Sequence, residues 1–142
     1  MKKLILIGRT GSGKTTLMQK LSGEVLAYSK TQAIRYDEHI IDTPGEYAET
    51  NRLGGALAVY SFEADVVGLV LSATEQYSLY SPNIASLANR EVIGIVTKTD
   101  LPEADPDRAE RWLRLTGCKT IFRISSVSGD GISDILTYLS DT

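Results

Sequence analysis

The amino-acid sequence predicts an α/β fold in which helices cover both faces of a mostly parallel six-stranded sheet with one antiparallel edge strand. The first observation is that continuous apolar runs, typical of strands buried on both faces, alternate with helical patterns. Such alternation predicts parallel strands joined by helices. The second observation is a pair of short apolar runs, 33–36 and 39–42, separated only by Asp37 and Glu38, which predicts a hairpin and hence the antiparallel edge.

The expected elements follow in order along the chain. The predicted strands are 3–8, 33–36, 39–42, 66–72, 91–97 and 120–124. The predicted helices are 14–21, 81–89, 106–116 and 132–140, and 56–62 can also be helical. We expect Gly23 and Gly117 to end two of the helices and Pro82 to begin one, and we expect 24–30 to be irregular.

The composition indicates a single domain, residues 1–142, of an ordinary globular kind, with 42% hydrophobic and 23% charged residues. The formal net charge of −3 argues against nucleic acid as a partner, because surfaces that bind nucleic acid are normally basic. No apolar run approaches the roughly 20 residues that span a membrane. The single cysteine, Cys118, cannot form an internal disulfide, which favours a cytoplasmic protein.

The segment from Gly8 to Thr15, GRTGSGKT, matches the pattern G-x-x-x-x-G-K-[ST] completely, between a predicted buried strand and a predicted helix. Glycines let the backbone turn its N–H groups inward, and the amino end of the helix adds positive charge, so that such a loop binds phosphates. We expect Lys14 to reach the β- and γ-phosphates of a nucleotide and to be catalytic, and Thr15 to bind Mg²⁺. The predicted binding residues of this loop are Gly8, Arg9, Thr10, Gly11, Ser12, Gly13, Lys14, Thr15 and Thr16.

The segment DTPG, residues 42–45, follows the second strand of the predicted hairpin. Asp42 can hold Mg²⁺ through a water molecule, and the N–H of Gly45 can touch a γ-phosphate, so that the following loop senses whether that phosphate is present. By itself D-x-x-G is also a common turn. Its position after the phosphate loop favours the nucleotide interpretation.

Two further segments point to guanine. In TKTD, residues 97–100, the carboxylate of Asp100 can accept hydrogen bonds from N1–H and the exocyclic amine of guanine, a pair of donors that adenine lacks. Lys98 is expected to lie along the base and brace the phosphate loop. The contacts expected from this segment are Thr97, Lys98 and Asp100. The backbone expected to meet the guanine O6 is that of Ser125, Ser126 and Val127. The alternative is that Asp100 is only a turn or helix-cap residue.

The ordered motifs GRTGSGKT, DTPGE, TKTD and SS-x-SGDGI resemble those of small GTPases of the translation-factor-like P-loop class. KTQAIRYD, IDTPGEYAE, VVGLVLSATEQYSLYSP and VIGIVTKTDLP resemble more closely the ethanolamine-utilisation protein P and propanediol-utilisation protein V family, and the resemblance covers essentially the whole chain. It implies a Ras-like P-loop NTPase fold and an association with bacterial microcompartments that process ethanolamine or propanediol. It also implies that Thr31 coordinates Mg²⁺ in the triphosphate state, whereas taken alone Thr31 could be an ordinary loop residue.

Glu46 stands directly after Gly45, where many signalling GTPases have a glutamine that orients the attacking water. A carboxylate can accept a hydrogen bond from water, which makes Glu46 the second catalytic candidate, but it repels the γ-phosphate and has no amide N–H to donate. Hydrolysis is therefore expected to be slow unless another group or a partner completes the site. Arg9 is a candidate cation for the transition state, and an outward, solvated side chain is the expected alternative.

Three functions remain as hypotheses. The leading one is a Mg²⁺-dependent guanine-nucleotide-binding protein that binds GTP or GDP, with ATP as an alternative ligand, and hydrolyses GTP slowly. The second is a small phosphotransferase that moves a γ-phosphate to a carboxylate such as acetate. The third is a nucleotide-gated module that docks on a microcompartment shell or on an enzyme. Glu46 and a group of tyrosines motivate the third hypothesis: Tyr47, Tyr60, Tyr77 and Tyr80.

Overall fold

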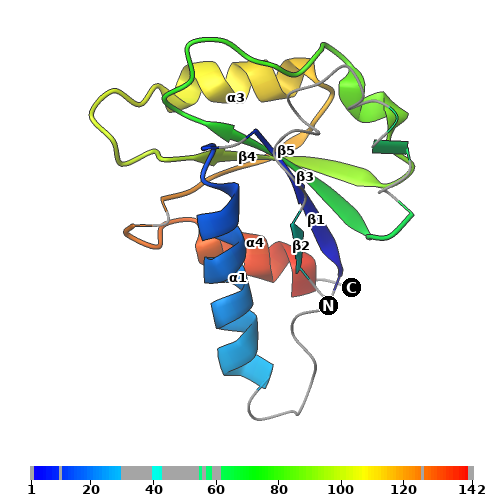
Figure 1. The fold of residues 1–142 in the computed structure, drawn as a ribbon, viewed down its shortest axis with the longest axis vertical. Coiled ribbons are helices and arrows are strands. Elements are labelled where there is room, and N and C mark those ends of the chain that lie inside the picture. The colour runs from blue at the N-terminus through cyan, green and yellow to red at the C-terminus, as the bar shows by residue number, and fades with distance from the viewer. Residues whose placement is uncertain are drawn as a thin grey trace.

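Five parallel strands form one sheet in the computed structural model, which describes residues 2–9, 11–29, 40–42, 55, 57–58, 62–125 and 127–140. The strands are β1 (Leu4–Ile7), β2 (Ile40–Asp42), β3 (Val66–Ser72), β4 (Glu91–Thr97) and β5 (Thr120–Arg123). Their order across the sheet is β2-β1-β3-β4-β5, and each neighbouring pair is parallel (Figure 1). The prediction of an α/β fold with a mostly parallel sheet is therefore confirmed.

The predicted antiparallel edge strand, 33–36, lies outside the described residues, so a sixth strand stays a prediction. The other arm of the predicted hairpin is β2, which pairs in parallel with β1 and places Leu4 opposite Ile40 and Leu6 opposite Asp42. This register brings Asp42 beside the end of β1, where the phosphate motif begins.

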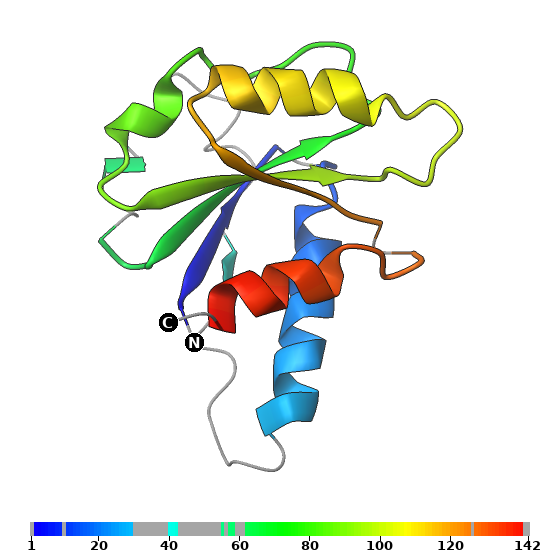
Figure 2. The same cartoon turned by 180° about the vertical axis from the view of Figure 1, so that it is seen from behind.

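Helices cover both faces of the sheet, as expected when each connection between parallel strands crosses over one face. The helices are α1 (Lys14–Ser29), α3 (Pro106–Leu115) and α4 (Ile132–Ser140), with one turn of 3₁₀-helix, η3 (Ile84–Leu87). α3 covers one face, and α1 and α4 cover the other, as the two opposite views show (Figures 1 and 2).

The two helical layers enclose two apolar cores, and β1 contributes to both. Ile5 and Ile7 face the core that contains Leu113 of α3, while Leu4 and Leu6 face the core on the side of α1 and α4. All four β1 side chains are at most 1% exposed. A strand buried on both faces must be continuously apolar, which explains the unbroken run of apolar residues in β1.

Helix α1 is longer than predicted. It continues through Gly23 to Ser29, so the expected helix end at Gly23 and the expected irregular conformation of 24–29 are both wrong. Glycine in a helix costs only about 1 kcal/mol relative to alanine, which good helix formers on both sides can offset. Gly23 is exposed, and among the described residues no atom outside the backbone of the helix itself lies within 4 Å of the position that a Cβ would take.

The helix predicted over 81–89 is also wrong, because this segment holds only the single turn η3. Asn83 has a left-handed backbone, with φ 63°, which interrupts a right-handed helix. The N–H of Ile84 donates to the carbonyl of Ser81, three residues back, at 3.2 Å. Pro82 therefore belongs to a turn and not to the first turn of an α-helix.

Helices α3 and α4 begin and end close to the residues that the sequence predicts. α3 begins after Asp105, whose carboxylate accepts a hydrogen bond from the N–H of Arg108 at 3.1 Å, and Gly117, with φ 106°, follows the helix end. α4 has the predicted bounds. Of the range 56–62, the structure describes 57 and 58, which are helical, and 62, which lies in a turn.

Candidate functional site

The predicted site residues that the structure describes gather at one edge of the sheet, where the carboxyl ends of the parallel strands meet. Gly8 follows β1, Asp42 ends β2, and Lys98 follows β4. Open α/β sheets bind ligands at this edge. The predicted site residues that lie outside the described part of the chain are Thr10, Thr31, Gly45, Glu46 and Ser126.

The phosphate loop turns sharply between β1 and α1. Gly11 and Gly13 have φ of 85° and 90°, in the left-handed region that favours glycine. The N–H of Ser12 donates to the carbonyl of Arg9 at 3.1 Å, and the N–H of Leu17 donates to the carbonyl of Gly13 at 2.9 Å. The loop thus passes directly into the first turn of the helix, which is the arrangement that binds phosphates at a helix amino end.

A cavity of about 330 Å³ lies against this loop and the start of α1. It is lined by Arg9, Gly11, Gly13, Lys14, Thr15, Thr16 and Lys98. Among the described lining residues three are cations and none is acidic, a charge pattern that suits an anion. Lys14 is only 6% exposed, whereas Thr15 and Thr16 are exposed.

The second half of the phosphate loop is braced from the end of β4. The hydroxyl of Thr97 donates to the carbonyl of Ser12, and Nζ of Lys98 donates to the carbonyl of Gly11 at 2.6 Å. Lys98 has φ 59°, which costs a non-glycine residue on the order of 1 kcal/mol. This strained backbone accompanies a side chain that crosses to the phosphate loop, as the sequence predicts for Lys98.

Asp100 is held by the loop that follows β5. The hydroxyl of Ser125 donates to Oδ1 of Asp100 at 2.8 Å, and the N–H of Ser128 donates to the same hydroxyl oxygen at 3.2 Å. Asp100 itself is exposed, and so is Val127, at 86%. Asp105, not Asp100, caps helix α3, so the helix-cap alternative for Asp100 is wrong. Asp100 does lie in a turn, where the N–H of Leu101 donates to the carbonyl of Lys98 at 3.3 Å, so the turn alternative stays open.

Arg9 is not a purely solvated side chain. Its Nη1 lies 3.1 Å from Oε2 of Glu75, and its guanidinium carbon lies 5.9 Å from the centre of the Tyr77 ring. The exposed side-chain fractions of Arg9 and Glu75 are 31% and 16%. Sequence reasoning missed Glu75, because a carboxylate in the segment after β3 matches no nucleotide-binding motif.

The tyrosines named by the docking hypothesis differ in their surroundings. Tyr77 is 61% exposed, whereas Tyr80 is only 6% exposed and its hydroxyl donates to backbone carbonyls. Burial raises the pKa of the Tyr80 hydroxyl well above its usual range. Tyr80 therefore belongs to the interior, and Tyr47 and Tyr60 lie outside the described residues.

The backbone arrangement brings two of the predicted Mg²⁺ ligands to the same edge of the sheet. Thr15 stands at the start of α1 and lines the cavity, and Asp42 lies at the carboxyl end of the neighbouring strand β2. A hydroxyl and a carboxylate are oxygen ligands of the kind that Mg²⁺ prefers, so this pair fits the ion. Within the described residues, no group of three or more His, Cys, Asp or Glu side chains could hold a metal ion.

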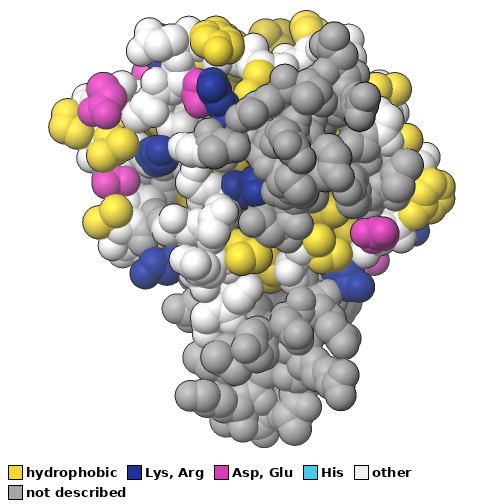
Figure 3. Space-filling model, viewed as in Figure 1, with side chains coloured by type: hydrophobic (Ala, Val, Ile, Leu, Met, Phe, Trp, Pro, Cys, Tyr) yellow, Lys and Arg dark blue, Asp and Glu magenta, His cyan; other side chains and the backbone are white. Residues whose placement is uncertain are grey.

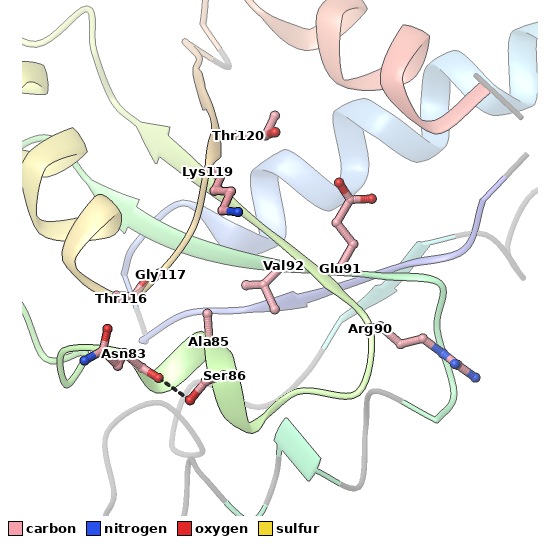
Figure 4. Close-up of a pocket in the computed structure, with 10 residues that line it drawn as sticks. All are labelled: Asn83, Ala85, Ser86, Arg90, Glu91, Val92, Thr116, Gly117, Lys119 and Thr120. Carbon is pink, nitrogen blue, oxygen red and sulfur yellow. Dashed lines mark hydrogen bonds between the residues drawn. The ribbon is translucent and has the colours of Figure 1, made fainter.

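A second hollow, of about 290 Å³, lies at the opposite edge of the sheet, beside the starts of β4 and β5, and Figure 4 shows the residues that line it. Its lining residues are Asn83, Ala85, Ser86, Arg90, Glu91, Val92, Thr116, Gly117, Lys119 and Thr120. The hydroxyl of Ser86 donates to the carbonyl of Asn83 at 2.8 Å, and the lining carries charges of both signs. None of the residues that the sequence predicts for the site lines this hollow, so it is separate from the candidate site.

Among the described residues, neither the surface charge nor the helices point to a further site. On the face drawn in Figure 3, the described lysine and arginine side chains are interspersed with acidic ones. In the part of the chain that the structure describes, no helix is both long and apolar enough to cross a bilayer.

The parallel sheet, the glycine loop that opens α1 and the cation-lined cavity at the carboxyl edge are consistent with the P-loop NTPase fold. A model of the family described as ethanolamine utilisation and propanediol utilisation, PduV-EutP, matches residues 1–141. The chain belongs to this family.

Relatives in the family align along nearly their whole length. The propanediol utilization protein PduV of Citrobacter freundii is 43% identical over 143 residues, which cover 99% of this chain and 94% of that protein. Proteins named "Probable acetate kinase EutP" from Escherichia coli (strain K12) and Salmonella typhimurium are each 31% identical, over 99% of this chain and 90% of theirs. The family resemblance inferred from the sequence motifs is therefore confirmed.

Proposed function

We propose that this protein binds guanine nucleotides with Mg²⁺ and hydrolyses GTP slowly, in the utilisation of ethanolamine or propanediol. The observation that carries the proposal is the direct link between the predicted base-binding segment and the phosphate loop. Nζ of Lys98 donates to the carbonyl of Gly11. Two residues further along the chain, the carboxylate of Asp100 accepts a hydrogen bond from the hydroxyl of Ser125. A nucleotide bound to the phosphate loop would therefore share its site with the carboxylate of Asp100, which the Ser125 hydroxyl holds in place.

Each residue has a stated role in this proposal. Lys14 and the backbone N–H groups of the loop would bind the phosphates, and the carboxylate of Asp100 would select guanine. Thr15, Asp42 and Thr31 would hold Mg²⁺, which supplies neutralisation of the phosphate charge when bound. The remaining proposed contacts, outside the described residues or through backbone, are Thr10, Gly45, Glu46, Ser126 and Val127.

Slow hydrolysis follows from the chemistry of Glu46. A carboxylate can accept a hydrogen bond from the attacking water, but it carries negative charge toward the γ-phosphate. Arg9 lines the cavity and could offset part of that charge. We also propose that the fold is Ras-like in full, with 33–36 as the sixth, antiparallel edge strand, and that the protein associates with a microcompartment.

The test of base selection is the substitution Asp100→Asn. The amide that replaces the carboxylate can donate a hydrogen bond to the C2 carbonyl of xanthine. Toward guanine it would place an N–H against the N–H donors of the base, so the preference should move from GTP to XTP. Affinities of wild type and variant for GTP, XTP and ATP would be measured by calorimetry. Asp134→Asn, an exposed acid of α4, is the matched control and should change none of them. If GTP still bound more tightly than ATP and XTP to Asp100→Asn, the base assignment would be wrong.

A second candidate function is supported by the names of two relatives. The proteins called probable acetate kinase are 31% identical to this chain over nearly its full length. The corresponding reaction would transfer the γ-phosphoryl group to a carboxylate oxygen, giving an acyl phosphate and a nucleoside diphosphate. An assay for acetyl phosphate with ATP and with GTP separates this candidate from slow hydrolysis, and acetyl phosphate no higher than in reactions without acetate would eliminate it.

A further inference from the structure

The first half of the phosphate loop is held by a segment that no nucleotide-binding motif identifies. This segment, residues 75–80, follows β3 and contributes Glu75, Tyr77 and Tyr80. Thr97 and Lys98 hold the second half of the loop from β4, so the loop is fixed from two neighbouring strand ends.

Tyr80 lies at the base of the loop. Its hydroxyl is 3.1 Å from the carbonyl oxygen of Ile7, the last residue of β1, and 2.8 Å from the carbonyl oxygen of Val70 in β3. The side chain is buried, and the raised pKa keeps the phenol protonated, so it is a donor at any physiological pH. The hydroxyl thus joins two strands at the point where the loop leaves the sheet.

The start of the loop is closely packed at the same place. A Cβ on Gly8 would lie 2.8 Å from Oγ of Ser12, 3.0 Å from Cβ of Val70 and 3.2 Å from the Val70 carbonyl oxygen. The backbone of Gly8 therefore packs against Val70, and the carbonyl of Val70 is one of the two that accept a hydrogen bond from the Tyr80 hydroxyl. A small change in the spacing of β1 and β3 at this point must move the loop.

Glu75 and Tyr77 provide a second hold on the same half of the loop. The carboxylate of Glu75 pairs with Arg9, and the Tyr77 ring lies under the Arg9 guanidinium. Glu75 is itself anchored, because Nη2 of Arg108 on α3 donates to its carbonyl at 2.7 Å. The segment therefore connects the phosphate loop to helix α3.

We propose that Tyr80 is a positioning residue of the phosphate site. Its hydroxyl fixes the start of the loop, so that phosphate affinity depends on a side chain that does not itself line the cavity. A loop held in its binding conformation loses less entropy when the phosphate binds. This inference rests on the proposed nucleotide-binding function and adds a residue to it.

Tyr80→Phe tests the inference, with Tyr138→Phe as a matched control. Tyr138 loses the same hydroxyl but lies on α4, packed edge-on against Phe122, with Nζ of Lys2 5.0 Å from its ring centre. Calorimetry on the full chain would measure Mg²⁺–GDP and, as a probe without a base, pyrophosphate. We expect the Kd of both ligands to rise by the same factor of about five to ten in Tyr80→Phe, and by less than about twofold in Tyr138→Phe.

A purely structural role for Tyr80 makes a different prediction. It would lower the thermal midpoint without changing either Kd at temperatures where the protein stays folded, and that result would overturn the inference. A rise in Kd for GDP alone would also overturn it, because the effect would then act on the base. If wild type bound neither ligand, the proposed function would fail and the inference with it.

Hydrogen exchange provides a readout that needs no ligand. Amide exchange in the peptide that covers 7–17 should become faster in Tyr80→Phe and stay unchanged in Tyr138→Phe. Unchanged exchange in Tyr80→Phe would contradict the positioning role even if nucleotides bind as proposed.

Discussion

The phosphate half and the base half of the candidate site are built differently. The phosphate loop has two glycines with positive φ, a lysine that is only 6% exposed, and braces from the ends of both β3 and β4. Among the described residues, the base half contains exposed Asp100, the Ser125 hydroxyl that holds it, and Val127, which is 86% exposed.

This difference separates two kinds of function. The proposed phosphate binding rests on backbone geometry and on side chains that brace the loop from the ends of β3 and β4, so many residues contribute to it. The proposed base selection depends on a few side chains near the surface, so a single substitution could change the nucleotide while the fold stays intact. The same scaffold could therefore serve a guanine-nucleotide-binding protein or a phosphotransferase with another base preference.

Lys14→Ala should have the largest effect, because it removes the buried cation of the phosphate half. Loss of a charged hydrogen bond to phosphate costs about 3 kcal/mol, or about a hundredfold in affinity for both GDP and pyrophosphate. Calorimetry would measure this loss, with Lys20→Ala, an exposed residue of α1, as control. An unchanged Kd in Lys14→Ala would contradict phosphate binding by this loop.

Gly131→Ala should be the most damaging change to the fold of the base half. A Cβ there would lie 2.3 Å from the Arg123 carbonyl oxygen, and φ is 83°. Gly129, with φ 85°, is the matched control, because among the described residues no atom beyond its two chain neighbours lies within 4 Å of a Cβ there, so alanine adds the backbone strain alone. We expect denaturant unfolding to show a loss of about 3 kcal/mol for Gly131→Ala and about 1 kcal/mol for Gly129→Ala. Equal losses would mean that the loop shifts to accommodate the added methyl group.

Ser125→Ala should have an intermediate effect that is confined to base recognition. It removes the donor that holds Oδ1 of Asp100, so GDP affinity should fall by about fivefold, which is about 1 kcal/mol, while pyrophosphate affinity stays the same. Ser133→Ala on α4 is the control. A parallel fall in pyrophosphate affinity would contradict the separation of the two halves.

Glu110→Gln should have the smallest effect, on stability alone. Burial raises the pKa of Glu110, but hydrogen bonds from Arg114 and Arg123 outweigh it and lower that pKa below its usual value. A lowered pKa in the folded state means that the carboxylate stabilises the fold near neutral pH and that this contribution disappears as the pH falls through the folded pKa. The ion pairs of Glu110 with Arg114 and Arg123 are partly exposed. We therefore expect thermal unfolding to show a loss of about 0.5 kcal/mol in the free energy of unfolding at neutral pH and none in acid. A loss that persisted in acid would assign the effect to packing.

The sequence was sufficient for the parts of the molecule where a local pattern has one physical cause. Continuous apolar runs predicted β3 and β4 with their observed bounds, and GRTGSGKT predicted the sharp glycine turn before α1. Local rules were insufficient where contacts elsewhere decide. Gly23 resembles a helix end but is a tolerated interior residue, and Pro82 precedes a left-handed Asn83 and not an α-helix.

The candidate site shows the same limit. Lys98 and Asp100 could be singled out because their motif is contiguous in the sequence. Tyr80 and Glu75 could not, because each acts on a loop about 70 residues away, and only the pairing of β1 with β3 brings them there. For the same reason the sequence offers an outward, solvated side chain as the alternative for Arg9, whereas its guanidinium pairs with Glu75.

Calorimetry on wild-type protein freed of nucleotide would show whether the site selects guanine. GDP, a GTP analogue, ADP and an ATP analogue would each be titrated with and without Mg²⁺. We expect clear preference for the guanine nucleotides and tighter binding when Mg²⁺ is present. Equal or tighter binding of the adenine nucleotides would contradict it, reduce residues 97–100 to a turn that braces the phosphate loop, and place the phosphotransferase function first.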